Sequence, residues 1–106
     1  KESFILIEGD TMNNTPKLKR EGSAGTEGRE DCIVKLFPAE AGTGIQIEIE
    51  GKSRDFFRDD VFKVFEETLK GMGITDVKVW SKGRSPLNFT IIARTKAAAI
   101  KGGAFE

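Results

Sequence analysis

One amphipathic stretch in the middle of the chain, residues 54–72, limits the possible folds more than any other feature. Large apolar residues recur there at spacings of three and four, so a helix collects them on one face and leaves the charged residues on the other. The apolar face consists of Phe57, Val61, Val64, Phe65, Thr68, Leu69 and Met72, with Phe62 at its margin. Ser53 or Asp55 can cap the first turn, and Gly71 and Gly73 can end the last. Such a face requires a second layer to pack against.

Short apolar runs on both sides of this helix predict a sheet as that layer. Each run has strand length and is bounded by turn-forming residues. The predicted strands are 32–37, 45–50, 74–80 and 87–93, and a short second helix over 94–101 ends at Gly102. The first two strands have a connection of hairpin length, and the last two are predicted to be antiparallel. The expected fold is α+β, of order β-β-α-β-β-α, with an antiparallel sheet packed against one long helix and a short C-terminal helix.

Composition divides the chain into three parts. Residues 1–22 are predicted to be a mobile N-terminal segment, residues 23–101 the folded domain and residues 102–106 a tail. One interpretation takes Met12 as the natural start and residues 1–11 as an addition derived from an expression vector. The other reads an edge strand between Ser3 and Glu8, and the sequence leaves both open.

The charge balance and the rare residue types exclude several function classes. The chain has 17 basic and 17 acidic residues and a formal net charge of zero, which argues against nucleic acid and membrane surfaces as partners. It has no histidine, the commonest general base and metal ligand at neutral pH, which argues against an autonomous hydrolase or metalloenzyme. A single cysteine, Cys32, and the lack of an apolar run near 18 residues favour the cytoplasm.

The glycine-rich stretch 22–31 is the first candidate for a functional site. It combines three glycines with the hydroxyls of Ser23 and Thr26, and it leads directly into the strand that begins at Cys32. Its spacing matches neither a phosphate-binding nor a dinucleotide-binding loop, so a flexible loop without chemistry is the alternative. Cys32 itself lies in an apolar run and is predicted to be a small buried hydrophobic residue rather than a reactive thiol.

Three further features each have a functional and a purely structural interpretation. The acidic face of the long helix is either a docking face for a basic partner or ordinary solvated surface. Trp80 either anchors an interface or packs inward, depending on which face of its strand is buried. The basic turn at residues 82–84 either steers a phosphate-bearing ligand or is a plain hairpin.

An ordered set of residues runs through the chain from about residue 22 to residue 100. Its members are Ala24-Gly25-Thr26, Asp31, Phe57, Asp59, Val64, Glu67-Thr68-Leu69-Lys70, Gly73-Ile74, Val77-Lys78-Val79, Lys82-Gly83, Leu87-Asn88 and Ala93-Arg94. No single motif among them is specific, but together they resemble the acyl carrier (gamma) subunit of citrate lyase. The delta subunit of malonate decarboxylase is a more distant relative of the same type.

The resemblance implies a non-catalytic carrier subunit rather than an enzyme. In that family a serine three residues past the Ala-Gly-Thr holds a phosphodiester-linked, phosphopantetheine-like group derived from 2'-(5''-triphosphoribosyl)-3'-dephospho-CoA, whose thiol carries an acyl group between the alpha and beta subunits. Such tethering replaces diffusion by a high effective concentration. The matching position here is Arg29, so Ser23 and, after it, Thr26 are the expected attachment hydroxyls.

Three hypotheses therefore remain at this point. The chain is a citrate-lyase-type acyl carrier modified on a displaced hydroxyl, and alpha and beta lyase subunits are its partners. Alternatively, it is a diverged and unmodified member that serves such a complex as a structural or regulatory subunit. The third hypothesis is an unrelated small α+β binding module.

Overall fold

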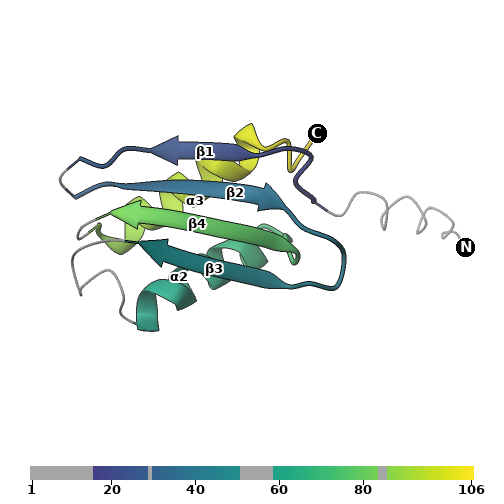
Figure 1. Ribbon diagram of the computed structural model, residues 1–106, viewed down its shortest axis with the longest axis horizontal. Helices are drawn as coiled ribbons and strands as arrows, with labels where there is room; N and C mark the ends of the chain where they lie inside the picture. The colour runs from purple at the N-terminus through teal and green to yellow at the C-terminus, as the bar shows by residue number, and fades with distance from the viewer. Residues whose placement is uncertain (1–15, 29, 51–58, 84–85) are drawn as a thin grey trace, which may run out of the picture.

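The computed structural model describes residues 16–28, 30–50, 59–83 and 86–106. Within these residues, four strands and two helices follow one another in the order β-β-β-α-β-α (Figure 1). They are β1 (Gly22–Gly25), β2 (Cys32–Pro38), β3 (Ile45–Glu50), α2 (Asp59–Gly71), β4 (Val77–Gly83) and α3 (Asn88–Lys101). The two interpretations of the N-terminal residues, the first turn of the predicted long helix and its Ser53 or Asp55 cap lie outside the described residues.

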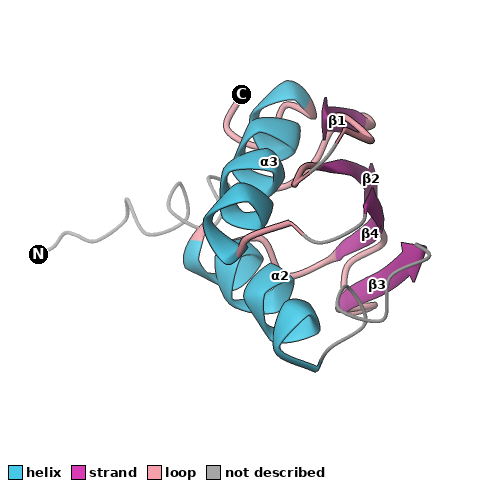
Figure 2. Cartoon of the chain, turned by 90° about the vertical axis from the view of Figure 1, so that its left-hand side faces the viewer, coloured by secondary structure: helices cyan, strands magenta, loops and turns pink. Residues whose placement is uncertain are grey.

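The four strands form one sheet in the order β1-β2-β4-β3, and both helices lie on the same face of it (Figure 2). β1 and β4 each pair antiparallel with β2, whereas β3 pairs parallel with β4. The α+β class and the helix-on-sheet layers are thus confirmed. The predicted hairpin between the strand at 32–37 and the strand that begins at Ile45 is wrong, because β4 lies between β2 and β3. The sheet is mixed rather than antiparallel.

The core lies between the sheet and the two helices. The inward side of each strand alternates with an outward side, so that β2 and β4 bury every second residue. Helix α2 contributes the predicted apolar stripe, of which Phe65 and Leu69 are fully buried. The largest buried side chains are Phe65, Leu36, Leu69, Ile74, Ile91, Val34, Val61, Val77 and Val79.

The second helix is longer than its sequence predicted. Residues 87–93 were expected to be a strand, but α3 already begins at Asn88, and that prediction is wrong. The buried positions of α3 are Ile91, Thr95, Ala98 and Ala99, which follow the spacing of one helical face. The β-branched run at the start of α3 is typical of a strand when it is considered alone. A helix forms instead because it places these four positions on one face against the sheet.

Some residues that were expected to lie in loops or tails belong to a strand or to the core. The first four residues of the stretch 22–31 form strand β1, and Gly22 is required there because an added Cβ would lie 1.9 Å from the carbonyl oxygen of Ala98 in α3. Leu18 and Ala104 are both buried in the core. Residues on either side of the predicted domain boundaries therefore belong to the packed part of the molecule.

Candidate functional site

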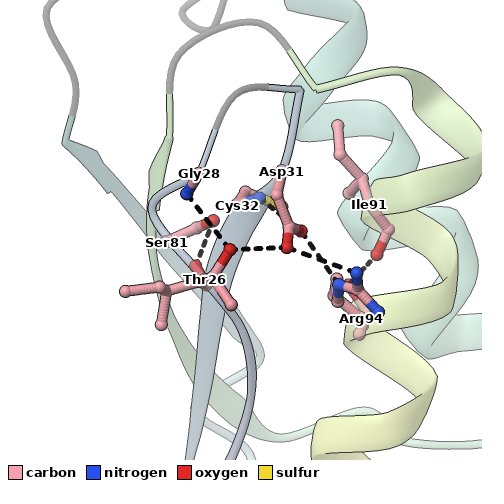
Figure 3. Close-up of polar contacts among 9 residues, drawn as sticks. Thr26, Gly28, Asp31, Cys32, Ser81, Ile91 and Arg94 are labelled. Carbon is pink, nitrogen blue, oxygen red and sulfur yellow. Dashed lines mark hydrogen bonds and ion pairs between the residues drawn. The ribbon is translucent and has the colours of Figure 1, made fainter.

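The tip of the β1–β2 hairpin is fastened by the side chain of Asp31. The Thr26 hydroxyl donates to Asp31 Oδ2 at 2.8 Å and accepts the backbone N–H of Gly28 at 3.1 Å. Asp31 Oδ1 accepts the backbone N–H of Cys32 at 2.7 Å. These bonds join both ends of the tip to one carboxylate (Figure 3). The described residues on both sides of the tip are thus linked by side-chain hydrogen bonds.

Helix α3 completes this arrangement with Arg94, which reaches across to the hairpin (Figure 3). Its Nε lies 2.9 Å from Asp31 Oδ1, and its Nη2 lies 3.3 Å from Oδ2, so the guanidinium binds the carboxylate in a bidentate manner. The side chain of Asp31 is only 15% exposed. The hydrogen bond from Arg94 is the main reason why the pKa of Asp31 falls to about 2, against the opposing effect of burial. The carboxylate is therefore charged at neutral pH and is a poor general base.

Thr26 is a structural member of this cluster. Its hydroxyl donates to Asp31 and accepts from Gly28, so both of its hydrogen-bonding functions are in use. Replacing its proton by a phosphodiester would bring a second negative charge within contact distance of the Asp31 carboxylate. Thr26, one of the two expected attachment residues, thus has a defined role that does not depend on any attached group.

Ser23 lies elsewhere, inside strand β1 and on the face of the sheet opposite the helices. It is half-buried and stands directly across from Lys35 of β2. None of the described residues forms a hydrogen bond with its hydroxyl. Ser23 and Thr26 are therefore not brought together into one site. Arg29, which the sequence comparison predicts to match the family's serine, lies outside the described residues.

Two buried groups behind the hairpin are inert. Cys32 is fully buried, and burial together with the charge of Asp31 raises the pKa of its thiol to about 11. This confirms that Cys32 serves as a small core residue. The Ser81 hydroxyl beside it donates to the carbonyl oxygen of Ile33 at 2.8 Å, which satisfies a polar group in the core.

The open face of the sheet, on which Ser23 lies, also carries Trp80. Its indole N–H donates to Glu50 at 2.7 Å, and the ammonium of Lys35 lies 5.4 Å from its ring centroid. Trp80 is thus half-buried on the outer face rather than in the core. Lys82, expected in a basic turn, belongs to β4 and pairs with Glu27 at 3.3 Å.

Comparison with known proteins identifies the family. The family model of the malonate decarboxylase delta subunit, an acyl carrier protein, matches residues 19–101. The citrate lyase acyl carrier protein of Halothermothrix orenii is 33% identical over 82 residues, which span 77% of this chain and 85% of that protein. This chain belongs to that acyl carrier family. The citrate lyase acyl carrier protein of Clostridium perfringens is likewise 33% identical, over 80% of this chain and 83% of its own length.

The fold agrees with this assignment. A chain in the crystal structure of a Pseudomonas malonate decarboxylase hetero-tetramer in complex with malonate superimposes with a TM-score of 0.63, at 14% identity, over 80% of this chain and 86% of that one. The predicted resemblance to the citrate lyase acyl carrier subunit is confirmed. In the described part of the chain no helix could span a membrane, and no group of three or more cysteine, aspartate or glutamate side chains is placed to hold a metal ion.

The sequence contained the members of the hairpin cluster but not their arrangement. Asp31 and Arg94 both belong to the residue set that resembles the family, yet 63 positions separate them. Nothing in the spacing indicates that they form an ion pair. Only the placement of α3 behind β1 and β2 brings Arg94 to the hairpin tip.

Proposed function

We propose that this protein is an acyl carrier subunit of a lyase or decarboxylase complex and carries its acyl group on an arm attached to Ser23. Membership of the acyl carrier family supports the general role. The observation that supports Ser23 over Thr26 is the difference between their hydroxyls. Thr26 uses its hydroxyl to fasten the hairpin, whereas that of Ser23 has no bond to a described residue.

The surroundings of Ser23 fit a phosphodiester. Lys35, its neighbour in the cross-strand register, supplies a positive charge on the same face of the sheet. No carboxylate of the described residues pairs with Lys35, whose ammonium lies over the Trp80 ring and can turn toward an anion. When bound, the prosthetic group would supply the thiol that carries the acyl group, a function that no side chain of this domain provides, because Cys32 is buried.

The remaining residues serve to hold this attachment point rigidly. Ser23 lies in a strand that is paired with β2 and backed by α3, so the attachment point is held by both the sheet and the helix layer. The partner subunits, which we propose to be lyase-type alpha and beta subunits, would supply the catalytic groups. A tethered acyl group reaches both of them at a high effective concentration.

A second candidate function is favoured by Arg29. A residue without a hydroxyl stands where the family's attachment serine is expected, and Thr26, three residues earlier, donates its hydroxyl to Asp31. A chain that keeps the fold and the partner contacts but carries no arm would serve the complex as a structural or regulatory subunit. This candidate predicts partner binding without any added mass.

Intact-mass spectrometry on protein purified from its native host separates the two candidates. The carrier predicts an added mass that is lost in Ser23→Ala and kept in Thr26→Val, while lyase-type or decarboxylase-type subunits co-purify with all three forms. Co-purification of those subunits with an unmodified wild-type chain would contradict the carrier and support the second candidate. If no such subunits co-purify, both candidates fail.

A further inference from the structure

A hollow lies on the open face of the sheet, at the end of β2 away from the hairpin tip. Its volume is about 480 Å³, within the range of small-molecule sites. Phe37, Lys78 and Gln46 lie side by side on three adjacent strands, because Lys78 is in register with both of the others. Pro38, Ala39 and Thr43, at the end of β2 and in the β2–β3 loop, complete the lining.

The loop that forms one wall of the hollow is held in place by Asp76. Its Oδ1 accepts the backbone N–H groups of Gly42 and Gly44, each at 2.9 Å. The Thr43 hydroxyl donates to the carbonyl oxygen of Glu40 at 2.7 Å, which closes the turn from within. The backbone bonds to Gly44 and Gly42 are among the causes that lower the pKa of Asp76, so its charged form is the one that fastens the loop. The wall therefore exists without a ligand.

The lining combines two kinds of chemistry. Phe37, Pro38 and Ala39 offer an apolar surface suited to a short carbon chain. Lys78 is exposed, and no carboxylate of the described residues pairs with it. Its ammonium and the amide of Gln46 are donors that can bind a carboxylate. We propose that this hollow binds a short acyl chain that ends in a carboxylate, with Lys78 as the residue that selects for the negative charge.

The position of the hollow suits a group carried on Ser23, and this part of the inference rests on the proposed function. Ser23, Lys35 and Trp80 are in register across β1, β2 and β4, and Lys78 lies two residues before Trp80 on the same face. Strand spacing and rise place Ser23 and Lys78 about 12 Å apart. An extended arm of roughly ten bonds spans that distance. A carboxylate-bearing acyl group on such an arm would bind in the hollow while the arm is not bound to a partner subunit.

Nuclear magnetic resonance titration of the full, unmodified chain tests the hollow directly. The probe is monomethyl succinate, which has one carboxylate and one ester, and dimethyl succinate is its uncharged match. The monoester should shift the backbone amides of residues 37, 39–46 and 77–78 in a saturable manner, and the diester should shift them at least tenfold more weakly. Lys78→Gln and the nearly isosteric Gln46→Glu should each weaken monoester binding about tenfold, whereas Lys101→Gln on α3 should leave it unchanged.

Equal shifts around many surface lysines, or unchanged binding by Lys78→Gln, would overturn the proposal. Ser23→Ala separates the hollow from the attachment, since it should bind the free monoester as the wild type does even if the mass experiment finds no arm. Protein that carries an acylated arm should show the same shifts with no probe added, and Ser23→Ala should not. Absence of those shifts in acylated protein would restrict the hollow to free carboxylates and refute the binding of the arm's acyl group there.

Discussion

The two loops that flank strand β2 are each fastened by an aspartate, but by different means. Asp31 at the hairpin tip is mostly buried and bonds to Arg94, a residue of a distant helix. Asp76 at the other end bonds to the backbone of the β2–β3 loop and to the neighbouring Thr75. The first loop is therefore tied to the helix layer, whereas the contacts among the described residues tie the second to the adjoining end of the sheet. Disturbing the first should affect the whole fold, and disturbing the second only the local loop.

The largest expected effect is that of Asp31→Ala. The substitution leaves Arg94, the Thr26 hydroxyl and the N–H of Cys32 without their common acceptor. A hydrogen bond to a charged group contributes about 1.5–3 kcal/mol to stability. We expect the free energy of unfolding to fall by about that amount in chemical denaturation. Glu40→Ala, which removes an exposed carboxylate from the other loop, is the control. Equal stability of the two variants would contradict the role of Asp31.

Acid should remove the same contribution in the wild type. The pKa of Asp31 is lowered in the folded protein to about 2 from its ordinary value near 3.8, chiefly by the Arg94 hydrogen bond, so the stabilisation is complete above the ordinary value. It is lost as the pH falls from about 4 through 2. Denaturation curves at pH 5, 4, 3 and 2 should converge for the wild type and Asp31→Asn. Parallel curves over that range would show that the ion pair contributes nothing.

Thr26→Val should have a smaller effect, because it removes one neutral donor and leaves the Asp31–Arg94 pair intact. We expect a loss of about 0.5–1.5 kcal/mol in the free energy of unfolding. Thr26→Ser keeps the hydroxyl and serves as the control. A loss as large as that of Asp31→Ala would mean that the hydroxyl, and not the ion pair, holds the tip.

Asp76→Ala should have the smallest effect on global stability and the clearest local one. The amides of Gly42 and Gly44 lose their acceptor, so their hydrogen exchange should accelerate at least tenfold, while exchange of the core amides in β2 and α3 stays the same. The experiment is hydrogen exchange followed by nuclear magnetic resonance at neutral pH. A destabilisation that spreads to α3 would refute the contrast between the two loops.

Much of the fold can be predicted because single segments encode it. The stripe of α2 has a strong helical period, and β3 alternates isoleucine with polar residues, so each is recognisable without its neighbours. The start of α3 is not recognisable in this way, because Phe89, Thr90 and Ile91 form a run typical of a strand. Its helical period appears only when Ile91 is read together with Thr95 and Ala98, which the prediction had assigned to a separate element.

Long-range pairing is what the sequence could not supply. A connection of hairpin length after β2 suggests that β3 is the partner of β2. Instead β4 lies between β2 and β3, where its inward residues are more completely buried than those of β3. The candidate site shows the same limit. Ser23 and Thr26 look equivalent in the sequence, and only the contacts of Asp31 distinguish a structural hydroxyl from one without a partner among the described residues.

Peptide mapping tests the central claim, an arm on Ser23, most directly. Trypsin cuts after Arg20 and Arg29 and so releases both candidate hydroxyls in one peptide, residues 21–29. In protein from the native host, tandem mass spectrometry should find the added mass on fragments that contain Ser23 and not on those that contain Thr26 alone. Full recovery of the unmodified peptide, or an added mass on Thr26, would contradict the account.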